Sequence, residues 1–392
     1  MPSAAGDQLR HPPPSSHLRP PCPAKERLHR WRPASSRTPL NDLGQPQPLT
    51  PLMLARVESV LQMAWAPSTA ETYGTSLAAF HWFCNQADIA EADRAPASRD
   101  LLEVFASALV GVYSLSTINN YLAAVRAWHI IHGLELKTHK PTMDALLKAA
   151  IIMAPPDAQR AKRPPLRLEK IDTIKSLLAL DKPLDSAVFA CLTTTFWGTT
   201  RLGEFTLPDK IHFDATTHIA RSAIRQVTDR EGNVAWVFRV PRTKTEVAGE
   251  DIYWAPQPSS TSDPLQALQN HFRVNGPPPD GHLFAYKHGT SYRPLRKKRF
   301  LERINDLLMK VRQETIQGHS IRIGSTLEYL LRGMSFEALK VKGRWSSDAY
   351  TKYLRAHAEI MAPYIQENPT LREELVQRTI PPIQRAGNRR AH

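Results

Sequence analysis

The stretch GHSIR, residues 318 to 322, places a histidine and an arginine three positions apart, and two tyrosines follow in GRWSSDAYTKYLR, residues 343 to 355. On a helix, His319 and Arg322 would leave the same face. A histidine exchanges protons near neutral pH, and a guanidinium fork can bind two phosphate oxygens while staying charged. A tyrosine hydroxyl can act as a nucleophile. Together these side chains could cleave a phosphodiester bond without a metal ion.

Residues upstream could complete such a site. Arg201 is followed three residues later by Glu204, a carboxylate that could orient a neighbouring cation. Lys244 lies in the polar turn PRTKTE, from which a long ammonium could reach into a groove. Lys210 and Arg242 are alternatives for this lysine, because the register of a hairpin cannot be read from sequence.

Each of these residues has an ordinary structural explanation when taken alone. An arginine in a basic protein is usually a surface residue, and a single histidine is usually structural or exposed. Tyr350 and Tyr353 on a helix could simply pack in a core. Their order and spacing along the chain are what favour a catalytic site.

The composition favours two folded domains and a polyanionic partner. The chain has 392 residues, a length that usually exceeds one domain with a single core. Hydrophobic residues make up 42% of it. Its formal net charge of +14 favours nucleic acid, because binding releases the counterions condensed on a phosphate backbone. The sequence contains no run of roughly 18 apolar residues, so no membrane span is predicted. Cys22, Cys84 and Cys191 are too scattered for a disulfide framework or a metal site, so an intracellular setting is expected.

Proline content and hydrophobic spacing divide the chain. Residues 1–51 hold 12 of the 33 prolines and no sustained apolar period, which predicts a disordered basic arm. Helical spacing over residues 52–153 predicts a compact all-helical domain, with one helix opening at Ser98 and another ending at Gly133. The basic, proline-rich residues 154–165 are typical of a linker.

The remainder mixes helix and strand over residues 166–363. VAWVFRV, residues 234 to 240, alternates like a strand with one buried face, and IYWAP, residues 252 to 256, is its predicted partner. In the tail, residues 364–392, the stretch from residue 380 is basic, and residues 368–377 could form a short partner-docking helix.

These features in this order resemble the tyrosine recombinases, the phage-integrase-like enzymes that break and rejoin DNA. The shared pattern is an arginine, a lysine in a β-turn, His-x-x-Arg, a histidine or tryptophan, and a tyrosine, after an all-helical domain. Residues 318 to 355 are most similar to recombinases of eukaryotic mobile elements, the Crypton and DIRS-like groups, where tryptophan commonly replaces the second histidine. The resemblance implies a mainly α fold. An all-helical core-binding (SAM-like) domain would precede an α+β catalytic domain with a small antiparallel sheet.

The resemblance also implies a role for each matching residue. In the family, two arginines bind the scissile phosphate, the histidine handles protons, the lysine protonates the leaving 5′-oxygen, and the indole N–H donates a further hydrogen bond. The tyrosine forms a 3′-phosphotyrosyl link, so rejoining needs no cofactor and no metal. The matching positions are Arg201, Lys244, His319, Arg322, Trp345 and Tyr353, with Glu204 as the supporting acidic residue.

Spacing separates the candidate nucleophiles. Tyr353 lies eight residues after Trp345, one short of the spacing usual in the family, whereas Tyr350 lies five and Tyr364 nineteen residues after it. Tyr353 is therefore the predicted nucleophile, and Tyr350 is expected to be a packing residue or a neighbour of the site.

The resemblance predicts a site-specific DNA recombinase or integrase. Its partners would be double-stranded DNA and further copies of the chain in a synaptic tetramer, with no membrane. The predicted function and the basic residues 160–163 and 295–299 favour a nuclear location, although residues 295–299 would equally suit a helix that faces DNA. Two other functions stay open: a DNA-binding protein derived from such an enzyme that no longer cuts, and a type IB topoisomerase-like nicking and closing enzyme. A basic α+β protein without this chemistry would have to match the whole set by chance.

Overall fold

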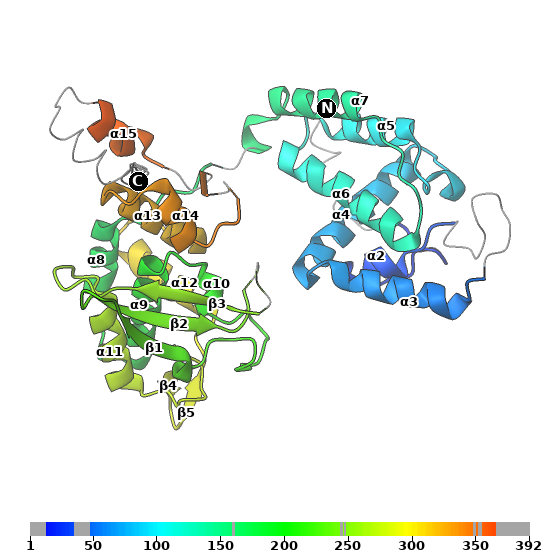
Figure 1. Ribbon diagram of the computed structural model, residues 1–392. Helices are drawn as coiled ribbons and strands as arrows, with labels where there is room; N and C mark the ends of the chain where they lie inside the picture. Colours follow the sequence, from blue (N-terminus) through cyan, green and yellow to red (C-terminus); the bar gives the residue numbers. More distant parts are fainter. Residues whose placement is uncertain are drawn as a thin grey trace, which may run out of the picture. The chain divides into compact units, whose positions relative to one another are not determined.

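The structure is a computed structural model that describes residues 13–34, 48–158, 161–243, 246, 248–347, 350–351 and 355–365, apart from the side chains of residues 363 and 364. The chain divides into two compact units, Met1–Ala161 and Lys162–His392, whose elements are drawn in Figure 1. The division falls inside residues 154–165, where the sequence predicts a linker. Residues 368–377, the predicted docking helix, lie outside the described residues.

The described residues of the first unit form helices joined by loops, with no strand among them. Ser98 caps one helix by accepting a hydrogen bond from the Leu101 backbone amide at 3.1 Å, and Gly133 ends another with a left-handed φ of 70°, as the sequence predicts. The main helices are α3 (Pro51–Leu61), α4 (Pro67–Gln86), α5 (Arg99–Leu109), α6 (Leu115–His132) and α7 (Lys140–Ile152), with short 3₁₀ turns η2 (Gln62–Ala64), η3 (Glu91–Asp93) and η4 (Pro156–Ala158). Their buried apolar side chains, which form one core, include Leu77, Phe80, Phe105, Ile118, Val125 and Trp128.

The N-terminal segment departs from the predicted disordered arm. Residues 13–34 contain η1 (Ala24–Glu26) and α2 (Arg27–Arg30), and both pack on α4, with α2 also against α6. Leu28 and Trp31 are buried in the core of this unit. The prediction of disorder is therefore wrong here, because burying two large apolar anchors outweighs the proline-rich composition around them.

Close backbone approach holds this segment on α4. Gly74 faces η1, and a Cβ at this position would lie 1.8 Å from the Ala24 carbonyl oxygen. The indole N–H of Trp128 donates a hydrogen bond to the Trp31 carbonyl at 2.7 Å. The segment is thus part of the folded unit and depends on a glycine in the middle of α4.

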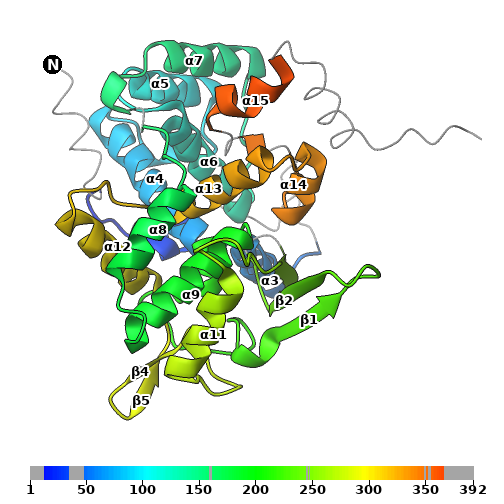
Figure 2. The ribbon, with the colours of Figure 1, turned by 90° about the vertical axis from the view of Figure 1, so that its left-hand side faces the viewer.

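The second unit is organised around a buried central helix. Every side chain of α9 from Asp185 to Trp197 is buried, and α11 packs along it, as Figure 2 shows. The helices of this unit are α8 (Leu168–Leu177), α9 (Pro183–Trp197), α10 (Leu202–Phe205), α11 (Pro264–Asn275), α12 (Lys297–Lys310), α13 (Gly318–Leu331), α14 (Phe336–Lys342) and α15 (His357–Ile365), with the 3₁₀ turn η5 (Arg221–Ala223). None of the described helices is long and apolar enough to cross a membrane.

A small antiparallel sheet completes the second unit, in the order β1-β2-β3. Its strands are β1 (Ile224–Thr228), β2 (Val234–Val240) and β3 (Glu250–Trp254), and Phe238 pairs with Ile252 across β2 and β3. β2 has the bounds predicted for residues 234 to 240, and β3 supplies the predicted partner, shifted by two residues at its start. β1 and the short hairpin of β4 (Tyr286–His288) and β5 (Ser291–Arg293) are additional to the prediction.

Candidate active site

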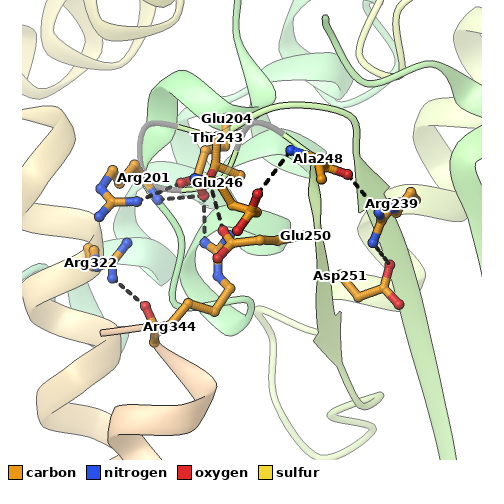
Figure 3. Close-up of polar contacts among 11 residues, drawn as sticks. Arg201, Glu204, Arg239, Thr243, Glu246, Ala248, Glu250, Asp251, Arg322 and Arg344 are labelled. Carbon is orange, nitrogen blue, oxygen red and sulfur yellow. Dashed lines mark hydrogen bonds and ion pairs between the residues drawn. The ribbon is translucent and has the colours of Figure 1, made fainter. Parts of the chain in front are cut away.

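The candidate site lies within the second unit, where α10, α13 and the turn after α14 contribute its charged side chains. Figure 3 shows Arg201, Glu204, Arg322 and Arg344 in this region, beside the residues that connect β2 to β3. These segments are far apart in the chain, so the fold, and not local sequence, assembles them.

Arg201 directly precedes α10, and its partner is Glu204 in the same short helix. The Arg201 backbone amide donates to Glu204 Oε2 at 3.2 Å, and its Nη1 donates to Oε1 at 3.0 Å. The Glu204 side chain is 5% exposed and that of Arg201 23% exposed. One edge of the guanidinium is therefore held by a buried carboxylate, while part of the side chain faces solvent. This is the orienting contact that the i, i+3 spacing predicts.

Arg322 is fully buried in α13. Its guanidinium carbon lies 4.4 Å from the centre of the Trp345 ring, and its Nη2 donates to the Gly343 carbonyl at 2.5 Å. A buried guanidinium is stable only when its donors and charge are compensated, and a π face and a carbonyl both contribute to this. The structure thus ties the arginine of His-x-x-Arg to the predicted tryptophan position.

In the turn between α14 and Trp345, the tryptophan ring packs directly against the backbone of Gly343. A Cβ at Gly343 would lie 1.7 Å from Cζ3 of the Trp345 ring, so only glycine allows the indole to fold back here. Trp345 is 8% exposed and packs in an apolar cluster with Leu327, Leu339 and Ile360.

His319 lies in the first turn of α13, where its side chain remains accessible to solvent. Partial desolvation of the ring lowers the pKa of His319 from its ordinary value of 6.5, and the charges of Arg163, Lys297, Arg322 and Arg201 lower it further. The imidazole is therefore neutral at pH 7 and can accept a proton.

Two predicted catalytic residues, Lys244 and Tyr353, lie outside the described residues, as does the side chain of Tyr364. Tyr350 is described, and its ring lies 6.1 Å from the rings of both Trp345 and Phe336. The contacts of Tyr350 are those of a packing residue.

Arg344 is a charged residue of this site that the sequence did not single out. Its Nη2 donates to Glu204 Oε2 at 2.6 Å, and its Nη1 donates to Glu250 Oε2 at 3.0 Å. The only signal in the sequence was its place between Gly343 and Trp345. The partners of Arg344 are 140 and 94 residues away, so no local pattern predicts the contact.

Comparison with known proteins shows the fold. No family model matches the chain, and no curated protein matches it. Several solved structures do. The XerH site-specific recombinase, in a post-cleavage complex with its palindromic difH substrate, is 12% identical with a TM-score of 0.50, over 92% of this chain and 100% of XerH.

Two further solved structures are similar at lower scores. The Tn1549 transposon integrase, in complex with circular intermediate DNA, is 13% identical with a TM-score of 0.45, over 80% of this chain and 99% of that one. The FLP recombinase, in a Holliday-junction complex, is 14% identical with a TM-score of 0.34, over 80% and 82%.

The chain has the fold of the tyrosine recombinases, as its sequence predicts: mainly α, with a helical unit ahead of a mixed unit that carries a small antiparallel sheet. The closer resemblance to Crypton and DIRS-like recombinases stays a prediction from residues 318 to 355.

Proposed function

We propose that this chain is a site-specific DNA recombinase or integrase that cleaves and rejoins DNA through a 3′-phosphotyrosyl intermediate, without a metal ion. The observation that carries the proposal is the surroundings of His319. Arg201 and Arg322, far apart in the chain, both lie close enough to lower its pKa, and Trp345 lies against Arg322. Nothing in the packing of a basic α+β unit requires this combination, and the recombinase fold supports the same conclusion.

In the proposed reaction, the scissile phosphoryl group passes from the 5′-oxygen of the DNA to the tyrosine oxygen. The Tyr353 hydroxyl passes its proton to neutral His319, and its oxygen bonds to the scissile phosphorus while the bond from phosphorus to the 5′-oxygen breaks. Lys244 gives a proton to that leaving oxygen. Arg201 and Arg322 stabilise the charge that builds up on the non-bridging oxygens. Attack by a 5′-hydroxyl then reverses the steps and releases Tyr353, so the bond energy is kept throughout.

Double-stranded DNA is the proposed partner. The formal net charge of +14 suits a phosphate backbone, and binding should weaken steeply with salt because counterions are released. XerH, the Tn1549 integrase and FLP were all solved as DNA complexes. Assembly into a synaptic tetramer, a nuclear location and an origin in a mobile element are part of the same proposal.

Covalent trapping tests this function. Purified protein is mixed in EDTA with a pool of nicked duplexes that lose a short fragment once cut, so that rejoining fails and the adduct accumulates. We expect an adduct from the wild type and a cleavage rate on the order of 100-fold lower for Arg322→Lys, which lacks the planar guanidinium that packs on Trp345 and donates to the Gly343 carbonyl. Arg332→Lys is the matched control, at an exposed position that caps the other end of α13, and it should cleave at the wild-type rate.

The outcomes separate the alternatives. Salt-sensitive DNA binding without an adduct from any chain would favour the DNA-binding protein that no longer cuts. An adduct without strand exchange between two differently marked duplexes would favour the topoisomerase-like enzyme. Strand exchange by the wild type supports the recombinase.

A further inference from the structure

Arg344 occupies a backbone conformation that is unfavourable for an arginine. Its φ is +57°, in the left-handed region that glycine and asparagine normally occupy and that costs other residues about 1 kcal/mol or more. Such strain persists only where surrounding contacts hold it, and it is concentrated at functional sites. The contacts of the side chain, which is 10% exposed, must therefore offset the free-energy cost of this backbone conformation.

Those contacts join two separate elements. The Arg344 fork lies between Glu204 of α10 and Glu250 at the start of β3, at 2.6 Å and 3.0 Å, as Figure 3 shows. Each carboxylate also has a second partner. Glu204 accepts from Arg201, and Glu250 Oε2 accepts from the Thr243 hydroxyl at 2.9 Å. A continuous chain of charge-assisted hydrogen bonds thus runs from Arg201 to Thr243, the residue before Lys244.

The geometry also explains why Arg201 keeps part of its fork available. Glu204 Oε2 is occupied by Arg344 and by the Arg201 backbone amide, so only Oε1 contacts the Arg201 guanidinium. Without Arg344, the buried carboxylate could turn both oxygens to Arg201 and form a bidentate pair. That pair would take donors away from a phosphate and neutralise the charge that should stabilise it.

We infer that Arg344 is a positioning residue for the proposed DNA cleavage reaction, and the inference rests on that proposed function. It limits Glu204 to one edge of Arg201 and anchors the segment around Thr243 to the same carboxylate. Both of its terminal nitrogens are engaged by Glu204 and Glu250, so it acts through these residues and does not itself contact the phosphate.

Single-turnover cleavage of the suicide substrate at saturating DNA tests the inference. Arg344→Gly removes the side chain and relieves the backbone strain at φ +57°. We expect cleavage about 100-fold slower, the size of effect that follows a misplaced catalytic group. Arg344→Lys keeps the charge but cannot bridge two carboxylates as a fork, so its rate should lie between those of the glycine variant and the wild type.

A second substrate distinguishes positioning from general damage. Replacing the scissile phosphate by a neutral methylphosphonate removes the charge that Arg201 stabilises. The loss caused by Arg344→Gly should therefore be clearly smaller on this substrate than on the natural one. Arg303→Ala is the matched control, because Arg303 also forks onto a buried carboxylate, Asp185, at 2.6 Å and 2.7 Å. It should lower the unfolding temperature and leave the ratio of the two cleavage rates unchanged.

The possible failures are distinct. If Arg344→Gly cleaves the natural substrate at the wild-type rate, the inference is overturned and the proposed function is left intact. An equal loss on both substrates that follows the unfolding temperature would have the same meaning. No adduct from the wild type would overturn the proposed function, and the inference with it.

Discussion

The guanidinium of Arg322 lies 4.4 Å from the centre of the Trp345 ring and donates a hydrogen bond to the carbonyl of Gly343, inside the protein. One buried contact therefore sets the arginine of His-x-x-Arg, the tryptophan and the turn between α14 and Trp345 relative to one another. A substitution at Arg322, at Trp345 or in this turn should therefore change the positions of the other two.

Gly343→Ala tests this coupling. The added methyl group would overlap the Trp345 ring at 1.7 Å, and because the φ of Gly343 is −79° the backbone itself accepts alanine. We expect the indole to be displaced from Arg322, a loss of about 1–3 kcal/mol in the free energy of unfolding, and slower covalent trapping. Near-ultraviolet circular dichroism, urea unfolding and the suicide substrate measure the three effects.

Gly203→Ala is the stability control for this substitution, since a Cβ there meets nothing within 4 Å. Its free energy of unfolding should not fall below that of the wild type, because alanine is the better helix former. An unchanged near-ultraviolet spectrum in Gly343→Ala would contradict the displacement of the indole.

The pH dependence of cleavage should report the surroundings of His319. Desolvation and neighbouring cations lower its pKa below 6.5, so the neutral form that accepts a proton persists to lower pH. The rate should fall only as the pH drops through the lowered pKa, with a midpoint below 6.5 on the acid side. Single-turnover rates across pH 5 to 8 give this midpoint.

Removing one of those cations should move the midpoint. Lys297→Met takes away one of the charges that lower the His319 pKa, and the midpoint should shift towards 6.5. Lys298→Met makes the same charge change at the neighbouring exposed lysine, and its midpoint should stay at the wild-type value. Equal shifts in both variants would contradict a local effect.

Lys342 should make stability rise with pH on the alkaline side. Its ammonium lies over the rings of Tyr253 and Tyr329 at 4.9 Å and 4.7 Å and donates to the Tyr253 carbonyl. Burial, and then the charge of Arg344, lower the pKa of Lys342 from 10.5 to about 8. Between these values the unfolded chain binds more protons than the folded one, so the free energy of unfolding increases with pH.

The size of this increase can be measured by difference. As the pH rises from 8 to 10.5, the free energy of unfolding of the wild type should increase by up to about 3 kcal/mol relative to that of Lys342→Met. Urea unfolding monitored by tryptophan fluorescence measures this difference. Lys310→Met, at an exposed lysine of α12, should follow the wild type. A constant difference between wild type and Lys342→Met would mean that the lysine titrates as it does in water.

Much of the secondary structure could be predicted from the sequence because its signals are local. Ser98 and Gly133 mark helix ends by capping and by left-handed backbone geometry, and the alternation of residues 234 to 240 matches β2. β1 escaped prediction because its burial pattern is exposed along most of its length, which leaves no apolar alternation to detect.

The site was only partly predictable for a different reason. His319 and Arg322 share one helix, so their spacing is visible in the sequence. The role of Arg344 depends on carboxylates in α10 and β3, and only the folded chain brings them together.

Gly74→Ala tests the one segment where the disorder prediction failed. A methyl group on Gly74 would meet the Ala24 carbonyl oxygen at 1.8 Å, so η1 should detach and draw Trp31 out of the core. We expect a lower unfolding temperature and faster proteolysis between residues 13 and 34. A variant as resistant as the wild type would show that the segment stays packed without a glycine at position 74.

The most direct test of the account is to find the residue that becomes linked to DNA. After trapping on the suicide substrate and nuclease digestion, trypsin should separate the two candidates, because Tyr350 lies in the peptide of residues 345–352 and Tyr353 in that of residues 353–355. We predict a nucleotide on Tyr353, located by mass spectrometry and lost in Tyr353→Phe but not in Tyr350→Phe. A nucleotide on Tyr350 would contradict the assignment of the nucleophile, and a linked residue other than tyrosine would contradict the proposed chemistry.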